Sequence, residues 1–179
     1  MAKINSFLIL LCFLFLFSNN SLANNCLIKV AESQVGVVEK TGNNDGVQVE
    51  AYLKTVGLGK GYSYCAAFVK WVFLQCGFKT NINAWSPTAH NKNNVVFENG
   101  RFQKEPKPLD VFTIYSLSKK RIVHTGFYRS YYNSKLFLTI EGNTSPTGAV
   151  GSKQDVDGHG VYKKLRSYNQ TYSITRHIP

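Results

Sequence analysis

The sequence predicts an α+β domain, with N-terminal helices packed on a C-terminal antiparallel β-sheet. Apolar residues recur at helical spacing before about residue 105, and short segments rich in β-branched and aromatic residues, divided by turn formers, follow. Helices early in a chain and strands later are typical of α+β domains. An apolar content of 44% and an aromatic content of 13% argue against a disordered chain.

The first 23 residues have the pattern of a secretory signal peptide. Lys3 precedes an apolar run over residues 7–17, and small residues follow up to Ala23. The run is shorter than the roughly 20 apolar residues of a membrane-spanning helix, although an uncleaved anchor is the alternative. Removing 23 of the 179 residues leaves 156, enough for one domain over residues 24–179. We therefore expect a secreted or periplasmic protein.

Three helices are expected before the sheet. The first spans residues 26–40, and the second spans residues 47–57 with Asp45 as its N-cap. The third runs from Cys65 to Gln75 and is followed by Gly77, a residue type that commonly ends helices. Between the first two helices, "TGNNDG" is rich in oxygen ligands but matches no calcium-ligand spacing, so we expect a turn.

Five strands are expected after a polar, irregular stretch over residues 80–107. Each is rich in β-branched or aromatic residues, and turn formers separate them. The expected strands are residues 110–115, 121–129, 135–141, 160–166 and 171–178. The short connection between the second and third strands favours a hairpin.

The cysteines indicate one free thiol. Removal of the signal peptide leaves Cys26, Cys65 and Cys76, and an odd number in an oxidising compartment leaves at least one unpaired. On one straight helix, Cys65 and Cys76 would lie about 16 Å apart, beyond the roughly 7 Å that a disulfide spans. A bond between Cys26 and Cys76 is possible, and Cys65 is the thiol expected to stay free.

Cys65 is a candidate nucleophile because of its place in the first turn of the third helix. A thiol reacts as thiolate, which the free N–H groups and the dipole of a helix N-terminus favour. The helix that follows, "AAFVKWVFL", is apolar on nearly all sides and is expected to be buried and rigid. Most free cysteines are packing residues, so the helix alone leaves that alternative open.

His124 is the candidate base, since it lies inside the apolar run "RIVHTGFY" of a predicted strand. In the predicted hairpin, Glu141 returns toward His124, and Asn143 is expected on the same side as Glu141. A carboxylate or amide beside a histidine fixes its tautomer and orientation. Taken alone, His124 also suits a buried structural histidine.

These segments together resemble the CHAP family, the cysteine- and histidine-dependent amidohydrolases/peptidases, which are related to NlpC-type and papain-like hydrolases. "YSYCAAFVKWVF" is similar to the family's nucleophile helix, "KPLDVFTIY" to its Pro-x-Gly-Asp strand, "VHTGFY" to its His-x-Gly strand and "IEGN" to its Glu-x-Asn strand. The resemblance covers most of residues 30–166. It departs at Leu109 and Val123, where the family often has glycine.

The resemblance implies a papain-like fold and hydrolysis of an amide bond through a thioester acyl-enzyme, without metal or cofactor. It implies Cys65 as nucleophile, His124 as base, Glu141 as the group that orients the base, and Asn143 as a further polar contributor.

Three aromatic residues are candidates for substrate binding. Tyr62 and Tyr64 precede the nucleophile and are candidates to help hold the oxyanion or to line the cleft. Trp85 is a candidate to stack on a sugar, or to pack on the rim of the cleft.

The net charge of +11, or +10 once Lys3 is removed, suits an anionic partner. For an exported protein this favours a cell-wall polymer over nucleic acid. With the resemblance, it implies peptidoglycan cleavage by N-acetylmuramoyl-L-alanine amidase or stem or cross-bridge endopeptidase activity. We expect a monomer without membrane insertion after signal cleavage. A secreted cysteine protease, an amidase toxin and an inactive wall-binding module are the alternatives.

Overall fold

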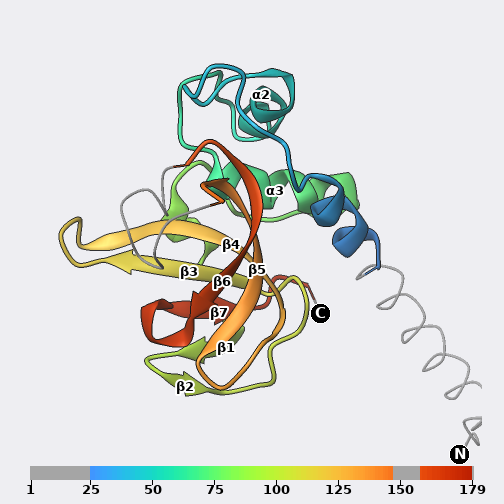
Figure 1. Cartoon of the computed structure of the whole chain (residues 1–179). Coiled ribbons are helices and arrows are strands. Elements are labelled where there is room, and N and C mark those ends of the chain that lie inside the picture. Colours follow the sequence, from blue (N-terminus) through green and yellow to red (C-terminus); the bar gives the residue numbers. More distant parts are fainter. Residues whose placement is uncertain (1–24, 147–157, 179) are drawn as a thin grey trace, which may run out of the picture.

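The structure, a computed structural model, describes residues 25–146 and 158–178 (Figure 1). The predicted signal peptide lies outside these residues, and none of the described helices is long and apolar enough to cross a membrane. The described residues form three α-helices and a seven-stranded sheet in which all neighbouring strands are antiparallel. This confirms the predicted α+β class.

The sheet follows the spatial order β2-β1-β7-β3-β4-β5-β6. Its strands are β1 (Val95–Glu98), β2 (Arg101–Phe102), β3 (Val111–Ser116), β4 (Arg121–Tyr131), β5 (Leu136–Thr144), β6 (Gly160–Ser167) and β7 (Ser173–Thr175). The five predicted strands correspond to β3 to β7, and β4 and β5 form the predicted hairpin. β1 and β2 correct the prediction for residues 80–107. They have four and two residues and pair with each other, and β1 also pairs with the distant β7.

The first helix spans residues 25–33 and is shorter than the predicted 26–40. Gly36 adopts a φ of 94°, in the left-handed region that glycine favours, and donates to the carbonyl of Val161 at 2.9 Å. Val161 in turn donates to the carbonyl of Val37 at 2.9 Å. Residues 36–38 therefore run along β6, and their apolar side chains follow the sheet rather than a helix.

The second helix, α2 (Val47–Lys54), ends before the predicted residue 57 and is not capped by Asp45. The Asp45 carboxylate instead accepts hydrogen bonds from the backbone N–H and the hydroxyl of Thr41, at 2.9 and 2.8 Å. These two hydrogen bonds occupy the Asp45 carboxylate within the loop over residues 41–46. Gly46 therefore takes the N-cap position of α2 without a side-chain cap.

The third helix, α3 (Cys65–Gln75), begins and ends at the predicted residues. It is buried between α2 and the sheet, where the rings of Phe68 and Phe73 lie 6.0 and 5.6 Å from the ring of Phe127 on β4. Burying each such side chain contributes about 1.5–3 kcal/mol to folding. The apolar packing therefore holds α3 rigidly with its N-terminus at one end of the sheet (Figure 1).

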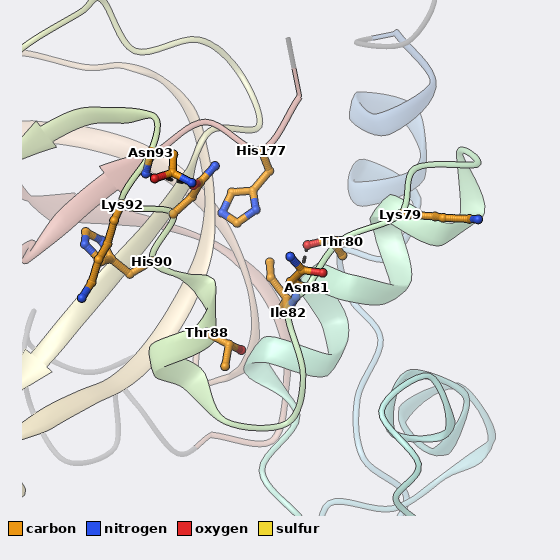
Figure 2. A pocket seen from close by; sticks show the side chains of 10 residues that line it. Lys79, Thr80, Asn81, Ile82, Thr88, His90, Lys92, Asn93 and His177 are labelled. Atoms are coloured by element: carbon orange, nitrogen blue, oxygen red, sulfur yellow. Dashed lines mark hydrogen bonds between the residues drawn. The ribbon is translucent and has the colours of Figure 1, made fainter.

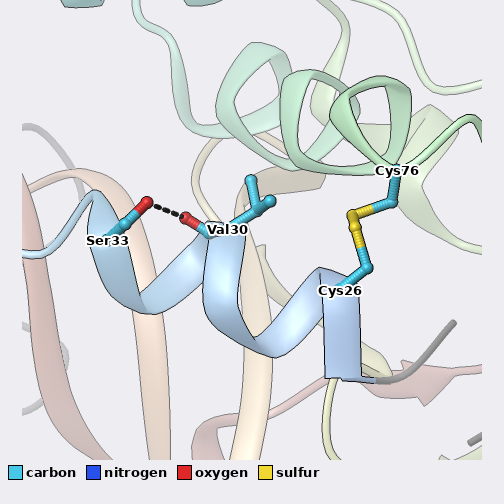
Figure 3. Close-up of a disulfide and its surroundings, with 4 residues drawn as sticks. All are labelled: Cys26, Val30, Ser33 and Cys76. Carbon is cyan, nitrogen blue, oxygen red and sulfur yellow. Dashed lines mark hydrogen bonds between the residues drawn. A yellow bond between two sulfur atoms is a disulfide. The ribbon is translucent and has the colours of Figure 1, made fainter. Parts of the chain in front are cut away.

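A disulfide joins Cys26 to Cys76, with 6.0 Å between the Cα atoms. It links the first helix to the residue after α3 (Figure 3). Among the described residues, Cys65 is the free cysteine, as predicted.

We expect Cys26→Ser with Cys76→Ser to lower the free energy of unfolding by about 2–4 kcal/mol, because the bond closes a loop between residues 50 apart. Urea unfolding without reductant would measure this. The alkylation rate of Cys65 should not change, since α3 separates Cys65 from the bond by about 16 Å. A variant as stable as the wild type would contradict the prediction.

Candidate active site

The N-terminus of α3 presents Cys65. The residue before it, Tyr64, is the N-cap, and its carbonyl accepts the first helical hydrogen bond from Phe68 at 2.8 Å. The ring of Tyr64 is fully buried and stacks on Tyr52, with 6.0 Å between ring centroids. This packing fixes the first turn of α3, so the position of the thiol is set by the core.

The Cys65 thiol is 3% exposed and lies 3.5 Å from the hydroxyl of Ser86. Ser86 belongs to a short 3-10 helix, η1 (Ser86–Ala89). Burial raises the pKa of Cys65, but hydrogen bonding and charge from His124, with the Ser86 hydroxyl, outweigh it. The net pKa lies below the ordinary value of a thiol, so the site favours a thiolate.

His124 on β4 and Glu141 on β5 are both fully buried and hydrogen-bonded to each other. Nε2 of His124 donates to Oε2 of Glu141 at 2.8 Å. The other ring nitrogen, Nδ1, has no hydrogen bond within ordinary distance to a described residue, so it is the nitrogen left for the thiol. Burial lowers the pKa of His124, but Cys65 and Glu141 together raise it to about 9.

Arg166 on β6 holds Glu141 from the other side, a contact that no sequence pattern indicates. Its Nε donates to Oε1 of Glu141 at 2.7 Å, and its Nη2 donates to Oε2. The Thr139 hydroxyl also donates to Oε1. Burial raises the pKa of Glu141, but Arg166 and His124 lower it to about 2, so the carboxylate stays ionised.

The cross-strand register explains why Arg166 meets Glu141. Arg166 pairs with Phe137, four residues before Glu141 on β5, and alternation places all three on one face of the sheet. In the sequence, period-2 alternation groups Lys164 with Arg166. No local signal shows that this face is the inner one.

Asn143 is buried, but not for the predicted reason. Its φ of 58° is left-handed, and the pairing of β5 with β6 shifts between Glu141 and Thr144. The alternation that was expected to align Asn143 with Glu141 is therefore interrupted. The backbone of Asn143 instead lies beside the Tyr64 hydroxyl, so it borders the start of α3.

Two glycines allow the strands of the site to pack closely. A Cβ on Gly126 would lie 2.8 Å from the Phe112 ring and 2.9 Å from Cγ of Glu141. A Cβ on Gly142 would lie 2.8 Å from Cβ of Phe68 on α3. The glycines of the "HTG" and "EGN" segments are thus required by contacts with Glu141 and with α3.

We expect Gly126→Ala to lower kcat/KM at least about tenfold and stability by about 1–3 kcal/mol, because the added methyl group displaces the Glu141 side chain. Steady-state kinetics and urea unfolding would measure both. Gly59→Ala is the matched control, since a Cβ there meets no atom within 4 Å. Equal activity of the two variants would show that Gly126 does not position Glu141.

The three predicted substrate-binding residues lie in different environments. Tyr62 is 56% exposed and Trp85 is 52% exposed, so both are accessible to a ligand. Tyr64 is fully buried, which corrects its predicted place in the cleft. Burial and the Glu39 carboxylate raise the pKa of Tyr64, so it remains a neutral phenol packed behind Cys65.

A separate cavity of about 400 Å³ lies between the segment after α3 and the chain around His90 (Figure 2). Polar side chains line it, including His90 and His177. His177 donates to the carbonyl of Ala89, and His90 bonds the Ser173 hydroxyl, so both imidazoles have structural partners. Cys65 and His124 do not line this cavity, and it is not the candidate site.

No family model and no curated protein sequence matches the chain. Among solved structures, the chain is similar to a histidine mutant of the resuscitation promoting factor interacting protein RipA, with 13% sequence identity and a TM-score of 0.44. The alignment covers 88% of this chain and 63% of that one, so the chain spans less than two thirds of the RipA structure. A similarity at this level does not assign the chain to a family.

Proposed function

We propose that this protein is an exported, cysteine-dependent hydrolase that cleaves an amide bond of peptidoglycan, with residues 24–179 as its catalytic domain. The observation that carries the proposal is the buried series of Cys65, at the N-terminus of α3, with His124 on β4 and Glu141 on β5. A nucleophile, a base and a group that orients the base are the parts of a Cys–His catalytic unit. An inert packing cysteine requires none of these partners.

Peptidoglycan is supported as the substrate by charge, compartment and resemblance. The chain carries a net charge of +11, which suits an anionic wall. The Cys26–Cys76 disulfide is typical of an oxidising compartment and agrees with export. The resemblance of the sequence to CHAP enzymes adds the bond type, an amide in the peptide part of the wall.

In the proposed mechanism, Nδ1 of His124 takes the proton of Cys65 and the two form an ion pair. The thiolate attacks the amide carbonyl carbon, and His124 gives its proton to the leaving amine as the C–N bond breaks. Water, deprotonated by His124, then attacks the thioester and releases the carboxylate product and the thiol. Glu141 keeps Nε2 protonated, so that Nδ1 faces the reaction throughout.

The oxyanion of the tetrahedral intermediates requires hydrogen-bond donors beside Cys65. The backbone N–H groups of the first turn of α3 have no partner within the helix, and we assign this role to the N–H of Cys65. The Ser86 hydroxyl, 3.5 Å from the thiol, is placed to donate to the thiolate. Asn143 supports the arrangement from behind, through the contact of its backbone with Tyr64.

The pH dependence of kcat/KM should be bell-shaped. The alkaline limb is expected near pH 9, because the pKa of His124 is raised to about 9 and a neutral His124 cannot protonate the leaving amine. The acid limb is expected below the ordinary pKa of a thiol, where the thiolate of Cys65 gains a proton. An alkaline limb near pH 6.5, the ordinary value for histidine, would contradict the proposed ion pair.

The test of the proposed function is mass spectrometry of purified peptidoglycan after digestion by residues 24–179. Protein alkylated at Cys65 with iodoacetamide is the control. Glycan fragments freed of peptide would identify an amidase, and shortened or uncrosslinked stems would identify an endopeptidase. If neither sample released fragments while both bound the wall, the protein would be a wall-binding module instead.

A further inference from the structure

We propose that Arg121 binds a free carboxylate of the substrate peptide at the edge of the site. The guanidinium carbon of Arg121 lies 4.3 Å from the ring centroid of Trp85. The proposal rests on the proposed hydrolase function and adds a specificity to it. The preferred substrates are stem peptides with an ionised carboxylate near the scissile amide.

The position of Arg121 follows from an irregularity in β4. Arg121 pairs with Ser116, and His124 pairs with Ile114. The partners lie two residues apart on β3, whereas Arg121 and His124 lie three apart on β4, because the register shifts at Val123. Because residues two apart share a face, Arg121 and His124 project from the same side of the sheet. The distance along β4 is three residues, or about 10 Å.

Trp85, which contacts Arg121, is also adjacent in the chain to a residue beside Cys65. It directly precedes Ser86, whose hydroxyl lies 3.5 Å from the Cys65 thiol. Trp85 is 52% exposed and Arg121 is half-buried, so the two side chains form a partly accessible rim beside the buried Cys65 and His124. A peptide bound with its amide at Cys65 would extend over this rim.

Arg121 differs from three other arginines in its partners. Arg129, Arg166 and Arg176 are each bonded to a carboxylate, those of Glu32, Glu141 and Asp110. Within the described part of the chain, Arg121 forms no salt bridge, and its Nη1 donates to the neighbouring carbonyl of Ile122 at 3.0 Å. Four of its five N–H donors are not used by that bond.

The chemistry of this arrangement suits a carboxylate. A guanidinium forms two parallel, charge-assisted hydrogen bonds with a carboxylate, and the contact with Trp85 holds its plane before the ligand arrives. In peptidoglycan, the sugars and the amide bonds are neutral, whereas the stem peptides carry free carboxylates. The second stem residue is either glutamate or its amidated form, isoglutamine, which provides a matched pair of ligands.

The experiment compares kcat/KM for two muropeptides that differ only in glutamate or isoglutamine at the second position. Arg121→Met should lower kcat/KM for the glutamate peptide about 10–100-fold, and that for the amidated peptide less than about threefold. Arg121→Lys should fall between, since lysine keeps the charge but not the paired donors. Arg101→Met, at an exposed position of β2, is the control for net charge and should change neither value.

Equal losses with both peptides, or no loss with either, would overturn the proposal. The rate of Cys65 alkylation should be the same in Arg121→Met and the wild type, which shows that the site is intact. Calorimetric binding of both peptides to Cys65→Ala, with and without Arg121→Met, separates this proposal from the hydrolase function. If binding favoured the glutamate peptide only when Arg121 was present, and the wild type cleaved neither peptide, the carboxylate site would be retained and the hydrolase function refuted. Binding without that selectivity, or no binding, would refute the carboxylate site.

Discussion

Cys65→Ala is expected to lower kcat/KM for wall peptides by at least about 10⁴-fold, because the acyl-enzyme cannot form without the sulfur. The fold should persist, since alanine fits the first turn of α3 and leaves only a small void. Circular dichroism and urea unfolding would check that the variant folds. Its digest of peptidoglycan should contain none of the wild-type fragments.

Two further variants test whether Cys65 and His124 act together. Cys65→Ser should be nearly as inactive as Cys65→Ala, because a hydroxyl does not ionise in the pH range where this thiol does. The double variant His124→Ala with Cys65→Ala should be no less active than either single variant. If the two residues act as a unit, removing one already removes the contribution of both. Retention of more than about 1% of wild-type activity in Cys65→Ala would exclude Cys65 as the nucleophile.

Arg166→Met is expected to lower the free energy of unfolding by about 3–5 kcal/mol and to abolish most activity. Arg166 is 1% exposed, and its loss leaves the buried Glu141 carboxylate without its guanidinium partner. Glu141 then gains a proton at higher pH, because Arg166 is the main group that holds its pKa near 2. A protonated or displaced Glu141 would no longer orient His124. Most activity should therefore be lost even though the variant still folds.

Urea unfolding at several pH values would measure the effect. In the wild type, Glu141 stabilises the fold above the ordinary carboxyl pKa of about 4.5, and this stabilisation is lost as the pH falls toward about 2. In Arg166→Met, the folded-state pKa of Glu141 lies closer to its ordinary value, so this loss of stability at low pH should be smaller. The double variant Arg166→Met with Glu141→Gln should regain much of the stability without regaining activity. A single variant destabilised by less than about 1 kcal/mol would show that the buried pair does not hold this part of the sheet.

Local sequence patterns were sufficient for α3 and for strands β3 to β7. The apolar run from Cys65 to Gln75, with Gly77 after it, marks both ends of α3. β3 to β7 each contain β-branched or aromatic residues bounded by turn formers, and these signals need no distant partner. For the same reason, the place of Cys65 in the first turn of a buried helix was predicted from neighbouring residues alone.

Long-range pairing overrode local patterns elsewhere. Val35 and Val38 continue the helical spacing of the first helix, but hydrogen bonds of Gly36 and Val37 with Val161, and the pairing of Val38 with Gly160, draw this segment to β6. β1 exists because it pairs with β7, whose sequence lies more than seventy residues later. Asp45 satisfies Thr41 rather than α2, a choice between two nearby donors that composition does not decide.

The sequence by itself determined the fold class and the order of three chemically distinct residues, Cys65, His124 and Glu141. Only the tertiary structure placed Arg166 on Glu141, buried Tyr64 behind Cys65 and set Arg121 over Trp85. The physical reason is that these contacts depend on strand register and on which face of the sheet is inside. Register and burial arise from residues distant in the chain, whereas helix and strand periods are properties of the local sequence.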